Sequence, residues 1–363
     1  MTKNVPRYVD WLGACAEKAP GLLFRIGQLE SKFLSFDTAG QPINKPVFIT
    51  GLPRAGSTVL AEILNAHAGT TSFQYRDYPF VHCPFVWNKL RSAVPLPQRR
   101  VERTHRDRLT VNLQSPEAID EMLWMAFFDN LHNSNFDNTL GSDTHAPAFA
   151  QFYADTLRKL LLVRKARRFI CKNNALFARL GFLKHIFPDA LFLVPVREPV
   201  AQIASLVKQD RLFREIQAKD PASRRYARRL SHFEFGLDFS PVNPGKPEMV
   251  ETINAHRARG EPALAYAHYW AGVYAFIIDS IMGDPALRPA VRFISYEQLC
   301  ARPDTMIEDI AAFCDLGDDS AMQAWAPHIA APAYYRPDFD SATRQAIESL
   351  TRPTWNRIGI SYE

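Results

Sequence analysis

A short loop near residue 51 combines glycine spacing, one arginine and two hydroxyl side chains. Gly51 and Gly56 are separated by four residues, and Ser57 and Thr58 follow directly. Successive amides in such a turn form a concave site for an anion, and a helix that starts there adds the positive end of its dipole. Arg54 contributes a planar set of donors that fits phosphate or sulfate oxygens. The loop therefore has the spacing of a phosphate-binding loop.

This loop departs from that of nucleotide-hydrolysing enzymes at one position. Ser57 stands where those enzymes carry a lysine that reaches the β and γ phosphates, next to a hydroxyl that holds Mg²⁺. Standard triphosphate hydrolysis is therefore not expected. Two alternatives stay open at this point: a P-loop nucleotide kinase that uses Mg-ATP, and a non-catalytic nucleotide-binding protein on the same fold.

The elements around the loop follow the order strand, loop, helix. Residues 47–50 form an apolar, β-branched run that predicts a buried strand, and residues 57–67 place apolar side chains at helical spacing. Similar short apolar runs predict strands at 169–171, 191–196 and 291–295. Helices are expected at 175–187 and from Pro199 onwards. Alternating strands and helices predict an α/β, P-loop-type three-layer fold with a central, mostly parallel sheet flanked by helices.

The length of 363 residues suits one domain, 1–363, that carries additions. Residues 1–42 are expected to form a helical segment of one or two amphipathic helices. Residues 211–262 are charged, rich in helix breakers and without long apolar periodicity, so we interpret them as an insertion or lid. Helices are also predicted at 263–282, 303–315 and 341–350.

Composition narrows the class of protein. Apolar residues make up 47% and charged residues 22%, which is typical of a globular chain, and the net charge of +5 suits a small anionic ligand. The basic residues form no long stripe with interleaved aromatics, so no nucleic-acid partner is expected.

Five scattered cysteines without C-x-x-C spacing predict neither zinc nor disulfides and favour a reducing compartment. Without an apolar run of about 18 residues or a signal-peptide pattern, we expect no membrane span and a cytoplasmic location. The sequence gives no indication of oligomeric state.

Three segments resemble the motifs of one family. Residues 47–60 resemble the 5′-phosphosulfate loop of PAPS-dependent sulfotransferases (PAPS is 3′-phosphoadenosine 5′-phosphosulfate), in the arginine form of the bacterial and tyrosylprotein branches. Residues 187–199 with Ser205 resemble the 3′-phosphate motif, and residues 295–299 give a weaker third match. The resemblance implies in-line transfer of a sulfuryl group from PAPS to a hydroxyl or amine of a small-molecule or peptide acceptor. The product PAP is released, and no metal is expected.

The resemblance also assigns donor-binding roles. The amides of Ala55, Gly56, Ser57 and Thr58, with the two hydroxyls, are expected to hold the 5′-phosphate. Arg54 is expected to stabilise the leaving phosphate and the transferring group. For the 3′-phosphate the residues are Arg197, which ends a predicted parallel strand where open α/β sheets bind ligands, and Ser205. Tyr296 is expected, by resemblance only, to help hold the adenine.

The acceptor side is defined less sharply. Lys172 ends the predicted strand 169–171 and is expected to be a second cation in the same crevice. The acidic residues of the family match Gln74 and Tyr75, so the family's base does not carry over. Asp77 is the nearest carboxylate and the first candidate base, although Arg76 beside it lowers its pKa and a structural contact between the two is the alternative. His82 is the second candidate, because imidazole titrates near neutrality.

Overall fold

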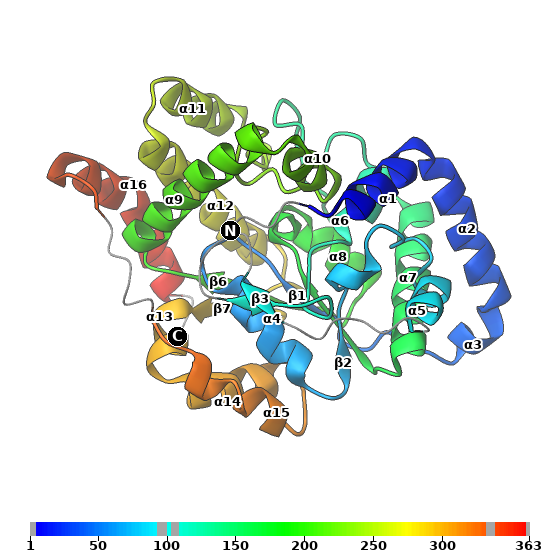
Figure 1. Cartoon of the computed structure of the whole chain (residues 1–363). Coiled ribbons are helices and arrows are strands. Elements are labelled where there is room, and N and C mark those ends of the chain that lie inside the picture. The colour runs from blue at the N-terminus through cyan, green and yellow to red at the C-terminus, as the bar shows by residue number, and fades with distance from the viewer. Residues whose placement is uncertain (1–4, 93–99, 103–108, 332–337, 361–363) are drawn as a thin grey trace.

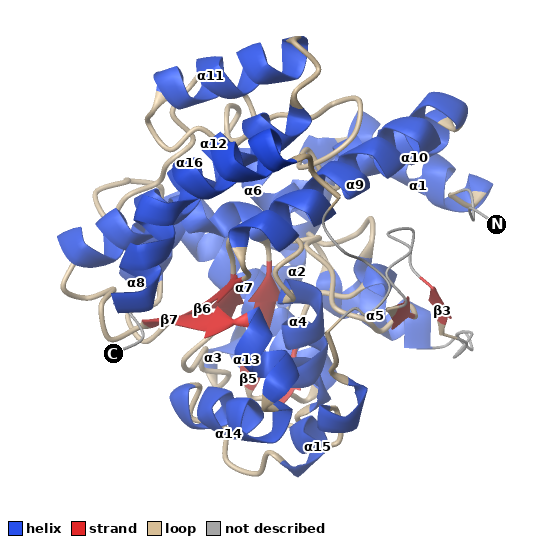
Figure 2. Ribbon diagram, turned by 90° about the vertical axis from the view of Figure 1, so that its left-hand side faces the viewer, coloured by secondary structure: helices blue, strands red, loops and turns tan. Residues whose placement is uncertain are grey.

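The computed structural model describes residues 5–92, 100–102, 109–331 and 338–360. A five-stranded sheet with the order β2-β5-β1-β6-β7 lies at the centre of the molecule (Figures 1 and 2). Its strands pair in parallel and are β1 (Val47–Ile49), β2 (Thr70–Thr71), β5 (Arg168–Lys172), β6 (Leu191–Val196) and β7 (Val291–Ser295). A separate antiparallel pair is formed by β3 (Val101–Glu102) and β4 (Thr110–Val111).

Helices follow or cover these strands. In the N-terminal half they are α1 (Arg7–Lys18), α2 (Pro20–Phe33), α3 (Ser35–Ala39), α4 (Ser57–Ala66), η1 (Tyr75–Asp77, a 3-10 turn), α5 (Pro84–Ser92), α6 (Glu121–Phe127) and α7 (Pro147–Arg164). In the C-terminal half they are η2 (Asn174–Arg179), α8 (Leu180–Ile186), α9 (Pro199–Lys219), α10 (Pro221–Arg229), α11 (Pro247–Ala258), α12 (Pro262–Gly283), α13 (Tyr296–Ala301), α14 (Pro303–Phe313), α15 (Ser320–Gln323), η3 (Ala326–His328) and α16 (Ser341–Ile360).

The core has two parts, one on each face of the sheet. Strand β1 shows why, since Phe48 packs on one face while Val47 and Ile49 pack on the other. Side chains that alternate along a strand point to opposite faces, and a parallel sheet buried on both faces therefore reads as a continuous apolar run. Helices lie on both sides of the strands in Figure 2. The predicted three-layer α/β fold is confirmed.

Several boundaries differ from the sequence-based expectation. The predicted strands at 47–50, 169–171, 191–196 and 291–295 are all present, but the N-terminal segment holds three helices rather than one or two. The helix expected at 175–187 begins as the 3-10 helix η2, capped by Asn173, whose side chain accepts the amide of Ala175. Helix α9 continues to Lys219, so the first residues of the expected insertion belong to this helix. Helix α9 therefore extends further than local periodicity indicated.

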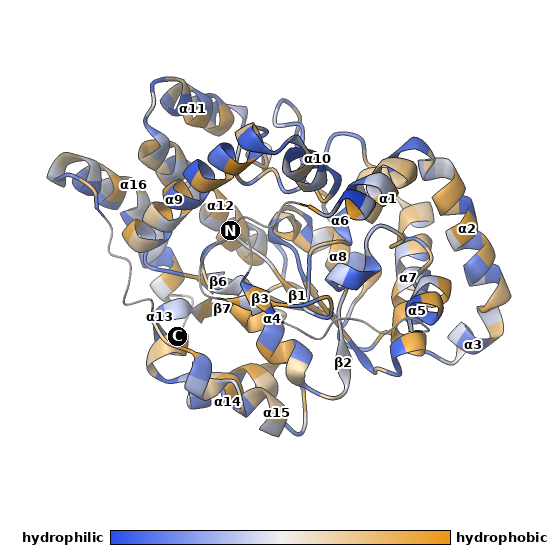
Figure 3. Cartoon of the chain, in the orientation of Figure 1, coloured by the Kyte–Doolittle hydropathy of each residue, from blue (hydrophilic) through white to orange (hydrophobic). Residues whose placement is uncertain are grey.

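Helix α10 is tied to helix α1 by ion pairs. Arg225 and Arg229 contact Asp10 at 2.5 and 2.7 Å, and Arg229 also contacts Glu17. The bonds from Arg225 and Arg229 bring the pKa of Asp10 down to about 2, against the smaller opposing effect of burial. Figure 3 shows α10 in the blue of hydrophilic residues. Its arginines therefore join the N-terminal helices to the rest of the fold.

In the parts of the chain that the structure describes, no helix combines the length and the apolarity needed to cross a bilayer.

Candidate functional site

The glycine-containing loop after β1 has an unusual backbone. Gly51, Arg54 and Gly56 all have positive φ angles, of 117°, 71° and 90°. Gly56 is the N-cap of α4, and a Cβ atom placed on it would lie 2.8 Å from the ring of Tyr296. Glycine is required there both by the left-handed backbone and by this close approach. Arg54 is not a glycine, and such backbone strain in an L-residue is concentrated at functional sites.

Helix α9 holds this loop at two points. Arg54 Nε donates a hydrogen bond to Ser205 Oγ over 3.1 Å. One turn earlier, the buried Gln202 donates through Nε2 to the carbonyl oxygens of Leu52 and Pro53, at 3.3 and 3.0 Å. Two segments separated by about 150 positions in the sequence therefore form one structure. Arg54 and Ser205, which the resemblance assigns to different phosphates, are in direct contact.

Arg197 and Tyr296 bring the third segment to the same place. Strands β6 and β7 pair so that Val196 lies opposite Ser295, which places the residues after both strands side by side. The guanidinium of Arg197 lies 4.7 Å from the centre of the Tyr296 ring. Cations stack favourably on aromatic faces at this distance. Since the same ring also packs against Gly56, Tyr296 joins the loop after β1 to the end of β6.

This arrangement agrees with a comparison against models of protein families. The model of the sulfotransferase family matches residues 46–238, which is more than half of the chain and includes the loop, Arg197 and Ser205. The chain belongs to the sulfotransferase family. It is accordingly an enzyme that transfers sulfuryl groups, and this membership sets aside the kinase and the non-catalytic alternatives.

Two solved structures of sulfotransferases are similar to this chain. Sulfotransferase STF9 from Mycobacterium avium is 13% identical, with 90% of this chain and 81% of that chain covered and a TM-score of 0.52. Sulfotransferase STF1 from Mycobacterium tuberculosis H37Rv is 16% identical over the same shares, with a TM-score of 0.49. At these identities the first likeness shows a common fold. No match was found among curated proteins.

The first candidate base of the sulfotransferase, Asp77, lies in a buried ion pair. Its two carboxylate oxygens both lie 2.6 Å from Arg164 Nη2, and they also accept the amide of Gln74 and the side-chain amide of Asn88. The residue is completely buried. A carboxylate with this many donors has no free face for an acceptor, so its contacts are those of a structural residue. Arg76, the partner expected from the sequence, is not the cation that it contacts most closely.

The second candidate, His82, is also enclosed. It is 4% exposed, and its backbone carbonyl accepts a hydrogen bond from Lys159. Burial, with the nearby charge of Lys159, lowers the pKa of His82 to about 4. A histidine with so low a pKa is a weak base at neutral pH. The structure has a pocket beside the glycine-containing loop after β1, called the phosphate loop below, and neither Asp77 nor His82 lines it.

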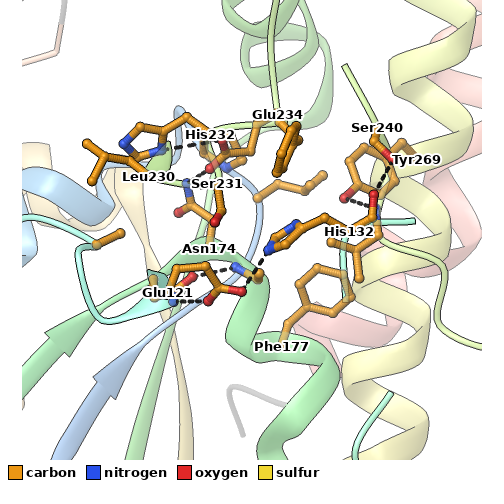
Figure 4. Close-up of a pocket in the computed structure, with 17 residues that line it drawn as sticks. Glu121, His132, Asn174, Phe177, Leu230, Ser231, His232, Glu234, Ser240 and Tyr269 are labelled. Carbon is orange, nitrogen blue, oxygen red and sulfur yellow. Dashed lines mark hydrogen bonds and ion pairs between the residues drawn. The ribbon is translucent and has the colours of Figure 1, made fainter. Parts of the chain in front are cut away.

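That pocket is lined by Leu52 and Pro53 of the loop. Figure 4 shows it in close-up, with Glu121, His132 and His232 among the labelled side chains. Its remaining lining residues are Ala118, Glu121, His132, Asn173, Asn174, Ala175, Phe177, Leu230, Ser231, His232, Phe233, Glu234, Ser240, Val242 and Tyr269. Many of them belong to the segment 230–242, within the region interpreted as an insertion or lid. The pocket mixes aromatic walls with ionisable groups, as binding sites for small molecules commonly do.

One wall of the pocket is fixed by a buried ion pair. Arg179 donates to both carboxylate oxygens of Glu121, at 2.9 and 2.6 Å, and His132 lies 2.7 Å from the same carboxylate. Burial alone would raise the pKa of Glu121, but the opposing charges of Arg179 and His132 hold it well below its ordinary range. Glu121 is therefore charged and fully engaged, and it keeps this wall rigid.

Sequence reasoning missed the ionisable group on the other wall. His232 lies between Glu117 and Glu234, and Lys172 is close enough to lower the pKa of both carboxyls. Lys172, expected as a second cation of the donor site, is thus close enough to this histidine to lower its pKa. Its strand β5 pairs with β1, the strand that precedes the glycine-containing loop. The only feature of the sequence that could have indicated this site is the triplet His232-Phe233-Glu234, which lies in a segment without periodicity.

Proposed function

We propose that this sulfotransferase uses PAPS as its donor and releases PAP. Arg54, the hydroxyls of Ser57 and Thr58 and the amides of Ala55 to Thr58 bind the 5′-phosphate and the sulfuryl group. Arg197 and Ser205 bind the 3′-phosphate, and Tyr296 packs beside the nucleotide. Lys172 adds positive charge near the transferring group. When bound, PAPS supplies the activated sulfuryl group, and these residues orient it and neutralise charge on the bridging oxygen.

The hydrogen bond between Arg54 and Ser205 carries this proposal. It joins the loop assigned to one phosphate with the helix assigned to the other, and this proximity supports a donor that carries phosphates at both the 3′ and 5′ positions. The close packing of Tyr296 on Gly56 and Arg197 supports the same assignment, because it leaves all three segments at the carboxyl end of the sheet.

We further propose that residues 211–262 select the acceptor, a small molecule or a peptide, and that the protein works in a reducing, cytoplasmic compartment. The first proposal is supported by the contribution of residues 230–242 to the pocket, including Phe233 and Val242. The second is supported by the five cysteines, all of which are free thiols. Enlarging Val242 to Phe should change which acceptors are sulfated while PAP affinity stays within about twofold; the reverse result would contradict acceptor selection by this segment.

The donor assignment is tested by calorimetric titration with PAP, with Mg-ATP and with adenosine 5′-monophosphate. Arg197→Ala should weaken PAP binding about 10- to 100-fold, because a charge-assisted hydrogen bond contributes about 1.5–3 kcal/mol. Binding of adenosine 5′-monophosphate, which lacks the 3′-phosphate, should be weak and insensitive to the change. As a matched control, Arg211→Ala alters an exposed arginine of α9, the helix that begins two residues after Arg197. Equal binding of PAP by wild type and Arg197→Ala would overturn the assignment.

A further inference from the structure

The ring of His232 lies between two carboxylates. Its Nδ1 is 3.7 Å from Glu234 Oε2, and its Nε2 is 3.6 Å from Glu117 Oε1. Both separations are ion-pair distances and longer than a normal hydrogen bond, so neither nitrogen is held in a short contact. The side chain is 28% exposed. It lines the pocket that Leu52 and Pro53 of the glycine-containing loop also line, so a molecule that fills the pocket can touch both the loop and this imidazole.

The surrounding charges favour the protonated ring. Burial lowers the pKa of His232, but Glu234 and Glu117 outweigh it and raise the pKa above 6.5, with Lys172 opposing them. Burial raises the pKa of Glu234, yet His232, Lys172 and Asn174 bring it down to about 2. Both glutamates therefore remain charged at neutral pH. A charged carboxylate beside an imidazole stabilises the imidazolium that forms when the ring takes a proton.

Asn174 gives an independent sign that this pocket receives a ligand. Its Nδ2 donates to Glu234 Oε1 over 2.9 Å, which fixes the orientation of the amide. Its Oδ1 is buried and has no hydrogen-bond partner within the described residues. Buried polar atoms are almost always paired, so an orphan acceptor that lines a pocket marks a position where a bound molecule supplies a donor. Hydroxyl and amine groups are such donors.

We propose that His232 is the general base of this sulfotransferase, with Glu117 and Glu234 as its positioning residues. The neutral ring accepts the proton of the acceptor hydroxyl while the acceptor oxygen forms its bond to sulfur. The bond between sulfur and the bridging oxygen breaks, and this oxygen leaves with its electron pair on the 5′-phosphate of PAP. His232 is left as an imidazolium and returns its proton to water. The inference rests on the proposed function, since it takes PAPS as the donor.

The kinetic test compares wild type with His232→Gln, a substitution of similar size that cannot titrate. Radiolabelled PAPS is the donor, and the acceptors are water, phenol and para-nitrophenol. We expect His232→Gln to lower the rates with water and phenol about 100- to 10,000-fold. The loss should be smaller with para-nitrophenol, whose more acidic hydroxyl needs less help from a base. His185→Gln, at an exposed position on α8, is the matched control and should behave as wild type.

The pH dependence of the sulfation rate distinguishes a general base from a structural residue at position 232. In wild type, the rate should rise with pH and reach a plateau above the raised pKa of His232. Glu117→Gln or Glu234→Gln removes a negative charge, so the inflection should move to lower pH and the plateau should fall. His232→Gln should show no inflection. An unchanged rate and an unchanged inflection in His232→Gln would overturn the proposal.

Two acceptor-independent measurements complete the test. Calorimetry should give the same PAP affinity for wild type and His232→Gln within about twofold. Proton NMR, with the His232 signal assigned from the variant, should show an imidazole that titrates above 6.5 and shifts when PAP is added. A His232 signal that changes neither with pH nor on addition of PAP would contradict the role of His232, even where turnover is too slow to follow. Failure of wild type to bind PAP would instead reject the donor assignment, so the two failures are distinguishable.

Discussion

Trp270 donates its indole N–H to Gln202 Oε1 over 2.9 Å, deep beneath the phosphate loop. With its oxygen held in this way, Gln202 can turn only its Nε2 towards the loop carbonyls of Leu52 and Pro53. Tyr274 lies beside the same amide and donates its hydroxyl to Pro195 O. A buried network thus holds the loop from below, while Arg54 is held by Ser205 of the same helix.

Replacing Gln202 with Leu should loosen this loop. The indole N–H of Trp270 and the carbonyl of Pro53 would be left buried and unpaired, at a cost of about 1–3 kcal/mol each. We expect a lower free energy of unfolding and a roughly tenfold weaker affinity for PAP, measured by urea denaturation and calorimetry. The matched control is Gln209→Leu on the same helix, because the buried Gln209 Nε2 has no partner among the described residues and its removal costs little. Equal effects of the two substitutions would contradict the positioning role.

Gly56→Ala should damage the donor site through the backbone. The positive φ of 90° costs an L-residue about 1–2 kcal/mol, and the new methyl group would lie 2.8 Å from the Tyr296 ring. Displacing Tyr296 also disturbs Arg197, so PAP affinity should fall together with stability. Gly21→Ala is the control, since Gly21 is exposed in a helix with open space around it and the change there should be neutral or stabilising. An unchanged affinity of Gly56→Ala would argue against contact between the nucleotide and this turn.

The ion pair of Arg179 with Glu121 should dominate the stability of the pocket wall. Arg179 is 1% exposed, and Arg179→Met leaves a buried carboxylate without its cation, at a cost of about 3–5 kcal/mol. The double variant Arg179→Met, Glu121→Gln should recover part of this loss in a double-mutant cycle. By contrast, Arg211→Met at the exposed pair with Glu215 should cost less than about 1 kcal/mol. Equal losses in the free energy of unfolding for Arg179→Met and Arg211→Met would contradict the larger contribution of the buried pair.

Asp120 should give the stability of the protein a distinct pH dependence. Burial and the charge of Glu121 raise the pKa of Asp120 to about 6, although Cys171 and Asn173 donate to it. The folded state therefore binds this proton more tightly than the unfolded state, and the associated stability is present at low pH and lost as pH rises to about 6. The introduced asparagine cannot titrate, so the free energy of unfolding of Asp120→Asn does not share this loss. The free energy of unfolding of Asp120→Asn minus that of wild type should therefore rise by up to about 3 kcal/mol between pH 4 and 6 and then stay constant. A difference that stays constant across this pH range for Asp120→Asn would contradict the raised pKa.

The sequence made the sheet and the donor loop predictable because their signals are local. The apolar run at 191–196 and the spacing from Gly51 to Gly56 each depend on neighbouring residues, and both appear in the structure as expected. The surroundings of Asp77 could not be predicted, because its partner Arg164 lies 87 positions further along the chain. The surroundings of His232 could not be predicted for the same reason, because its partner Glu117 belongs to a distant loop. In addition, no periodic pattern marks the segment that contains His232.

The order of strands in the sheet also sets the size of the donor site. The residues assigned to PAPS follow β1, β6 and β7, which are consecutive neighbours in the sheet. Neighbouring strands lie about 4.8 Å apart, so the three loops begin within about 10 Å of one another whatever side chains they carry. An engineer who wants a different anionic donor can therefore exchange the loops and leave the strands untouched, because the backbone of the sheet fixes the distances between the anion-binding positions.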